Sequence, residues 1–287
     1  TVYQALFKYQ KDKQWIGEIK RYQLDATGAI TNDAPVLASP KLKTRAATLG
    51  SYSSGGRSIW TVGYDPLCKN SVALSNDSNN NSFSQSNTAA LQDLLFNCPA
   101  VKDSAATNEL INFTRGLNTN GEEVAAFTAA RSSVLGDTYH SEMVMVGAPN
   151  APWSSDANMF GKSEAYFRST KGYTTFIANN ANRRKQIYVG ANDGMLHAFD
   201  SDLNERWAFI PPPVVPMLRN MAGNKGVGTF GGGNSNSIFT VDGPITVKDV
   251  YFYGEGKWKT VLQMTAMSVL LVVRQPASTL TFLPDCI

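Results

Sequence analysis

The stretch that decides the fold of this chain is residues 187–210, IYVGANDGMLHAFDSDLNERWAFI. It opens with β-branched and aromatic residues and then reaches Gly190-Ala-Asn192-Asp193-Gly194, whose members tolerate a left-handed turn. Residues 195–199, apolar except for His197, predict a return strand that ends at Asp200, and a polar turn leads into a third strand from residue 206. The pattern predicts three short antiparallel strands in sequence, which is most of one propeller blade.

This stretch resembles the blade repeat of quinoprotein-type β-propellers. It is more similar still to the C-terminal propeller of the type IV pilus tip and biogenesis family known as PilC or PilY. Three other segments, 133–141, 239–250 and 257–262, occur in that family's order and spacing. The resemblance assigns structural blade roles to ten residues: Gly190, Asn192, Asp193, Gly194, His197, Asp200, Trp207, Asp242, Gly243 and Trp258.

The expected fold is mainly β, a partial β-propeller of quinoprotein-like antiparallel blades with short helical and loop insertions. We expect one propeller domain over residues 1–262, with insertions concentrated at about 30–130 and the best-matched blades at 131–262. Residues 15–28 repeat the order of a strand, an aspartate and a glycine-bearing turn, and so predict a first blade edge. Apolar spacing predicts helices at 89–96, 104–117 and 214–221, a helix or short strand at 173–177 and a buried strand at 143–146.

The tail at residues 263–287 breaks this pattern, because it contains no glycine and little turn punctuation. Our hypothesis is that the reading frame is interrupted near Leu262, so that the chain carries only part of a propeller. The chain begins at Thr1 with no signal segment before it, which suggests a mature product or a piece of a longer protein.

A polar segment rich in Asn and Ser lies between Cys68 and Cys98 and predicts an exposed loop. A disulfide between these cysteines would close the loop in an exported protein, whereas a reducing compartment would leave two thiols. Cys286 has no counterpart in this scheme.

Bulk properties exclude several functions. There are 26 Lys and Arg residues against 23 Asp and Glu, so no strong field exists to recruit nucleic acid. The longest apolar run, residues 267–273, is far shorter than the roughly 20 residues that a spanning helix needs, so we expect no transmembrane segment.

No residue pattern predicts a catalytic, cofactor-binding or metal site. The two histidines, His140 and His197, are interpreted as structural hydrogen-bonding groups. The order Asp200-Ser-Asp202-Leu-Asn204 begins like a calcium loop, but Glu205 replaces the required glycine and Pro211 the final glutamate. The stretch therefore predicts a blade turn. Calcium binding is a property that the resemblance implies for the full-length family and assigns to no residue here.

The resemblance implies a secreted, non-enzymatic protein at the outer membrane, the cell surface and the pilus tip. Its implied partners are minor pilins and a host-cell or abiotic surface, and its implied roles are support of pilus assembly by opposing retraction, and adhesion. Two alternatives stay open: a periplasmic quinone-dependent dehydrogenase-like propeller and an outer-membrane assembly scaffold. The adjacent cysteine pair of many quinoprotein dehydrogenases is missing, since Cys68, Cys98 and Cys286 are far apart in sequence.

Overall fold

A computed structural model describes most of the chain. The described residues are 1–9, 15–31, 34–48, 54–62, 82–96, 103–117, 133–156, 163–222, 238–264, 269–273 and 280–282. Cys68, Cys98, most of the polar loop between them and the glycine-rich run 226–233 lie outside these residues, so the predicted disulfide and loop remain predictions.

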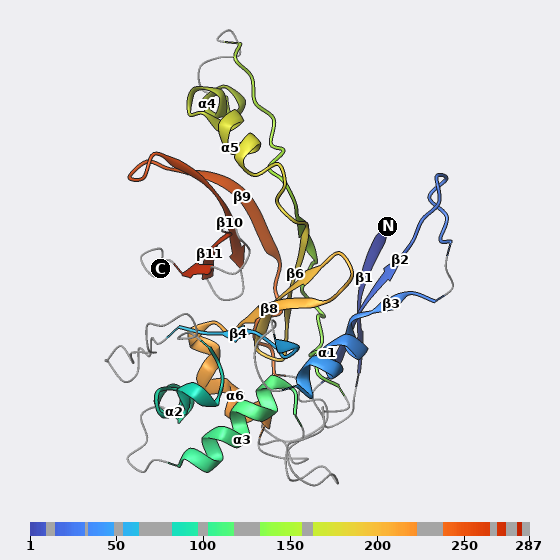
Figure 1. Ribbon diagram of the computed structural model, residues 1–287, viewed down its shortest axis with the longest axis vertical. Coiled ribbons are helices and arrows are strands. Elements are labelled where there is room, and N and C mark those ends of the chain that lie inside the picture. Colours follow the sequence, from blue (N-terminus) through green and yellow to red (C-terminus); the bar gives the residue numbers. More distant parts are fainter. Residues whose placement is uncertain are drawn as a thin grey trace.

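The described strands form three sheets (Figure 1). The first contains β1 (Val2–Lys8), β2 (Ile16–Tyr22) and β3 (Val36–Leu37). The central sheet has the order β4-β8-β7-β6-β5, with β4 (Ile59–Trp60), β5 (Val144–Val146), β6 (Gln186–Ala191), β7 (Met195–Asp200) and β8 (Glu205–Phe209). The third has the order β12-β11-β10-β9, with β9 (Ile245–Phe252), β10 (Lys257–Met264), β11 (Val269–Val273) and β12 (Leu280–Phe282).

The central meander confirms the prediction made from residues 187–210. Strands β6, β7 and β8 pair antiparallel in sequence, with Val189 opposite His197 and His197 opposite Ala208. Nearly every residue of these strands is buried because both faces of the sheet are covered. Ile187 and Val189 pack in a smaller core with the first sheet and α1 (Ala38–Ala46). Tyr188, between them, faces the larger core on the other side of the sheet. The alternation of side chains along a strand thus divides the interior into two cores.

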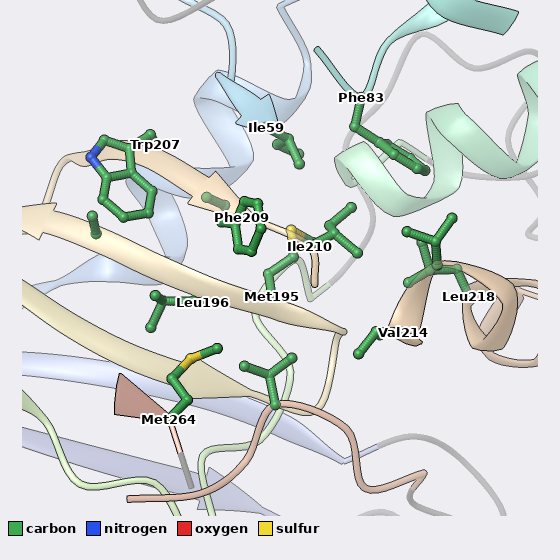
Figure 2. Packing of buried hydrophobic residues seen from close by; sticks show 14 of the residues in the cluster. Ile59, Phe83, Met195, Leu196, Trp207, Phe209, Ile210, Val214, Leu218 and Met264 are labelled. Carbon is green, nitrogen blue, oxygen red and sulfur yellow. The ribbon is translucent and has the colours of Figure 1, made fainter. Parts of the chain in front are cut away.

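The larger core lies between the central sheet and a group of helices. These helices are α2 (Thr88–Phe96), α3 (Ser104–Arg115), the 3-10 turns at Gln85–Asn87 and Pro212–Met217, and α6 (Leu218–Ala222). Figure 1 shows them together at one end of the molecule, and Figure 2 shows Val214 and Leu218 beside the Met195 end of β7. The predicted helices at 89–96 and 104–117 are confirmed. Asp103 begins α3 by accepting a hydrogen bond from the Ala106 N–H (2.9 Å), and Gly116 ends it at φ +102°.

Two short helices form the opposite end of the molecule. α4 (Glu164–Thr170) and α5 (Tyr173–Asn179) stand beyond the sheets next to the β9–β10 hairpin, as Figure 1 shows. We call α4, α5 and this hairpin the arm. The segment at 173–177, predicted as a helix or a short strand, is a helix. No helix of the described chain is long and apolar enough to cross a membrane.

Four local expectations differ from the structure. β5 is not a buried strand, because it is the edge of its sheet and leaves Met145 49% exposed. β4 pairs parallel with β8. The matched segment 239–250 enters the third sheet only from Ile245, so residues 239–244 lie outside the strand. In the tail, β11 pairs antiparallel with β10 and β12 with β11, so these residues extend a sheet despite their lack of glycine. The proposed interruption near Leu262 remains a hypothesis.

Candidate functional site

A chain of four charged side chains crosses the interior between β4, β7 and β8. Asp193 contacts His197 Nε2 through both carboxylate oxygens, each at 3.1 Å, and His197 Nδ1 lies 2.7 Å from Glu205 Oε1. Arg57 donates to both oxygens of Glu205, from Nε at 2.6 Å and from Nη2 at 2.8 Å. All four residues are buried, so this row of alternating charges is shielded from water. We call it the charge chain.

Electrostatics in the charge chain favours four ionised groups. Burial by itself lowers the pKa of His197, but the carboxylates of Asp193 and Glu205 outweigh it and raise that pKa to about 9. Burial would raise the pKa of Glu205, but Arg57 and His197 hold it far below its usual range. The pKa of Asp193 is likewise lowered against burial, chiefly by His197. The two cations and two anions therefore balance at neutral pH.

A third cation stands beside the charge chain and is hydrogen-bonded to the main chain of Arg57. Arg115, at the end of α3, donates to the main-chain oxygens of Phe83 (3.1 Å) and Arg57 (2.8 Å). Arg57 returns a bond to the Arg115 oxygen at 3.0 Å. Burial, and then repulsion from Arg57, lower the pKa of Arg115 to about 10. These bonds tie the helical insertion to the central sheet.

A second polar cluster surrounds Asn192 in the turn between β6 and β7. Its Nδ2 donates to Asp137 Oδ2 (2.7 Å) and to Asp242 Oδ2 (3.0 Å), while its Oδ1 accepts from the Thr240 N–H (2.8 Å). Asp242 also accepts from the His140 N–H at 2.7 Å. One buried amide thus joins three segments that are far apart in sequence.

Other main-chain segments approach this turn and the end of β6 so closely that only glycine fits at the points of contact. A Cβ on Gly190 would lie 2.0 Å from the Val241 oxygen, and one on Gly136 would lie 2.3 Å from the Asp193 nitrogen. Gly17 faces Gly136 in the same way, with 2.1 Å to its oxygen. Gly194 adopts φ +92° and packs on Leu218. Neighbouring segments therefore meet backbone to backbone around β6.

The Asp200 turn has the same construction as a turn in the first sheet. Asp200 Oδ1 accepts from the N–H groups of residues 202 (3.0 Å) and 204 (2.9 Å), as Asp25 Oδ1 does from residues 27 (2.8 Å) and 29 (2.9 Å). The fourth position has positive φ in both, +88° at Gly28 and +60° at Leu203. The two turns are therefore alike, as the predicted repeat requires, and each is built by an aspartate that accepts from the main-chain N–H groups that follow it. The interpretation of 200–204 as a blade turn stays a prediction.

The structure brings together six of the ten predicted blade residues: Gly190, Asn192, Asp193, Gly194, His197 and Asp242. Gly243 lies directly beside them and donates its N–H to the Val241 oxygen at 3.0 Å. Trp207 packs elsewhere, stacked on Trp60 with ring centroids 5.9 Å apart. Trp258 lies in the arm, where its Nε1 donates to the Lys171 oxygen at 2.9 Å. Asp200 caps the turn described above.

Sequence reasoning missed the other half of the charge chain. Nothing in the sequence around Arg57 indicates a buried ion pair, and Glu205 stands out only as the residue that replaces the glycine of a calcium loop. The available signal was a charged residue at the start of a strand whose remaining positions are mostly apolar, since such a residue needs a buried partner. His197 is confirmed as a strand residue with structural hydrogen bonds. His140 is hydrogen-bonded to Asp242, but it lies in a bend and its side chain is 55% exposed.

The arrangement joins segments that are far apart in the sequence. Each carboxylate of the charge chain accepts hydrogen bonds from groups of the protein itself. Across the residues that the structure describes, no three His, Cys, Asp or Glu side chains are grouped so that they could hold a metal ion. The site's evident role is to lock the turn of the central meander to its neighbours.

Comparison with known proteins places this architecture. Residues 135–269 match the family described as the PilY1 beta-propeller domain. The chain is 35% identical over 160 residues to a type IV pilus biogenesis factor PilY1 homolog of Xylella fastidiosa, a match that covers 55% of this chain and 12% of that protein. It is 31% identical over 265 residues to the type IV pilus biogenesis factor PilY1 of Pseudomonas aeruginosa strain PAK, covering 89% of this chain and 20% of that protein.

The chain thus spans a fifth or less of the length of these relatives. No solved structure matches it significantly. The antiparallel meander, the glycine-mediated contacts between neighbouring segments and the ordered match over 135–269 agree with one another, and this chain belongs to the PilY1 family, to whose β-propeller domain residues 135–269 correspond.

Proposed function

We propose that this chain serves type IV pilus biogenesis as a non-enzymatic scaffold at the pilus tip. There it would support assembly by opposing retraction and would mediate adhesion. The relatives named above carry the description of type IV pilus biogenesis factors, which supports the general assignment. The tip location, the minor pilins as docking partners and the surface ligand are parts of the proposal.

The observation that carries the scaffold role is the use of the charged residues. The members of the charge chain are hydrogen-bonded to one another in the interior, and Asn192 binds two further carboxylates. Satisfied buried networks of this kind fix one arrangement of the backbone. A stack of sheets locked at their turns suits a part that must transmit or resist force.

A genetic experiment tests the proposal. The gene is deleted in a piliated host, and surface pili are measured by shearing the cells and quantifying the major pilin. We expect pili to be lost and to return when the retraction motor is also removed. Adhesion, measured in that retraction-deficient background, should remain low until the gene is restored. Unchanged piliation after the deletion would refute a role in assembly, and full adhesion by the double mutant would refute the adhesive role.

A further inference from the structure

A groove of about 640 Å³ lies between the central sheet and the arm. Two runs of consecutive residues line it, residues 145–151 and residues 247–251 of β9. α4 contributes Glu164, Phe167 and Arg168, and the hairpin contributes Tyr253 and Trp258. None of these residues belongs to the charge chain or to the Asn192 cluster.

One wall of the groove is the edge of β9, and the other is the end of β5 with the segment that follows it. Successive side chains of a strand point to opposite faces, so a cavity against one face is lined by every second residue. Here five consecutive residues of β9 line the groove, which means that the edge of the strand borders it. β5 and β9 are terminal strands of their sheets, and in the described part of the chain β9 pairs only with β10 and β5 only with β6. Such an edge presents main-chain donors and acceptors to a further strand.

Side chains around the edge are apolar and partly open to solvent. Met145 is 49% exposed, Val250 40% and Tyr253 71%. Phe167, Tyr251 and Trp258 pack edge to face, with ring centroids 5.4 to 6.0 Å apart. An aromatic wall beside a strand edge provides pockets for alternate side chains of a bound peptide.

The surroundings of the groove are basic. Residues 163–185 and 245–264 contain eight Lys and Arg against three Asp and Glu, whereas the whole chain has 26 against 23. Lys171 lies 5.6 Å and 5.4 Å from the ring centroids of Tyr251 and Tyr253, and Lys248 lines the wall. Asp249 is already engaged, since it accepts hydrogen bonds from Tyr173 and Thr260. The lining of the groove carries Arg168, Arg183 and Lys248 against Glu164 and Asp249, and Glu164 is paired with Arg168. The charge that faces a ligand therefore has a positive excess.

We propose that this groove binds an extended, acidic peptide segment of another polypeptide, which adds as a strand to the open edge of β9. Main-chain hydrogen bonds to β9 supply the pairing, the aromatic wall accepts alternate apolar side chains, and the lysines select carboxylates. This site is independent of the proposed function, because it depends only on the geometry and charge of the groove.

Binding is tested with the 287-residue chain and a synthetic probe. The probe is a fluorescein-labelled nonapeptide of alternating valine with glutamate and threonine. Fluorescence anisotropy should show saturable binding, and ¹³C-carbonyl labels in the probe should report strand pairing by infrared spectroscopy. Two further probes carry N-methyl groups on alternate residues, one at the odd and one at the even positions. Only one of them should lose binding, because methylation removes the main-chain donors on one edge of the peptide. A probe with lysine in place of glutamate should bind more weakly by a factor of about ten or more.

Variants locate the binding site. Tyr253→Ala and Lys248→Glu should each weaken binding about tenfold or more, while Tyr139→Ala, which removes an aromatic ring that is 50% exposed outside the groove, should leave it unchanged. All three positions are exposed, and matched thermal melts confirm folding. Equal binding of both methylated probes would overturn strand addition. Binding of an acidic oligosaccharide without binding of the peptide, or dimerisation of the chain through this face, would overturn the proposed occupant.

Discussion

The central sheet and the arm use similar residues in opposite ways. β6 to β8 bury almost every residue and pair their charges inside, so that Arg57 and Glu205 have side chains 0% and 1% exposed. In the arm, the ion pair of Arg168 and Glu164 has one partner 77% exposed, and β9 exposes alternate residues. Charge removed from water fixes the fold, whereas charge left near water is available to a partner.

The largest expected effect comes from breaking the charge chain. Glu205→Gln would leave Arg57 and His197 charged, buried and without their shared carboxylate. Loss of one member of such a buried group costs about 3 to 5 kcal/mol. The matched change in the arm, Glu255→Gln, removes the ion pair with Lys259, which is worth less than about 1 kcal/mol at its exposed site. Urea unfolding of both variants measures the contrast, and equal losses would contradict it.

The next effect is a dependence of stability on pH. The pKa of His197 rises from 6.5 to about 9 on folding, so its contribution is complete below pH 6.5 and is lost as pH rises through about 9. The loss is on the order of 3 kcal/mol. The pKa values of Asp193 and Glu205 are lowered, so their contributions are lost only as pH falls into the acid range. Unfolding free energies between pH 6 and 9 should fall in the wild type and stay flatter in His197→Gln.

The central sheet and the arm should also differ in whether a glycine can be replaced by alanine, which adds one methyl group. Gly190→Ala should destabilise the chain by about 2 to 3 kcal/mol, because the new Cβ would collide with the Val241 main-chain oxygen. Gly254, in the β9–β10 turn, has nothing within 4 Å of an added Cβ, so Gly254→Ala should change stability by less than about 0.5 kcal/mol. Thermal melts of the pair provide the measurement. A harmless Gly190→Ala would mean that the two segments separate at no cost.

The smallest effect should be confined to the arm. Trp258→Phe keeps an aromatic ring near Tyr173 but removes the hydrogen bond to the Lys171 oxygen. We expect a loss of about 1 kcal/mol. Hydrogen exchange should become faster in α4 and α5 and remain unchanged in β6 to β8, which serve as the internal control. Faster exchange throughout would show that the arm and the central sheet unfold as one unit.

Local sequence signals were sufficient for much of the fold. The turn at 190–194 is decided by residues that accept left-handed backbone, and the helix at 104–115 by Asp103, Gly116 and apolar spacing. The repeat between Asp25 and Asp200 was visible because an aspartate that accepts hydrogen bonds from the next few N–H groups makes its own turn. In each case the interacting groups lie within a few residues of one another.

Long-range pairing was not visible in the same way. Arg57 and Glu205 are 148 positions apart, and the sequence around either residue does not indicate its partner. The sequence predicts a buried apolar strand around Met145, but this side chain is 49% exposed, and among the described strands β5 is the last in its sheet. The tail lacks glycine and yet contributes two strands, since a sheet edge can pair with any segment that presents free main-chain groups.

The sequence by itself determined the antiparallel blade, its turns and its helical insertions, since these depend on backbone preferences and on the spacing of apolar residues. Only the tertiary structure decided which charges are buried together and which strand edges remain open. The physical reason is that the energy of a charge or of a main-chain group depends on what lies opposite it across the fold, and that neighbour is brought there by the packing of whole sheets.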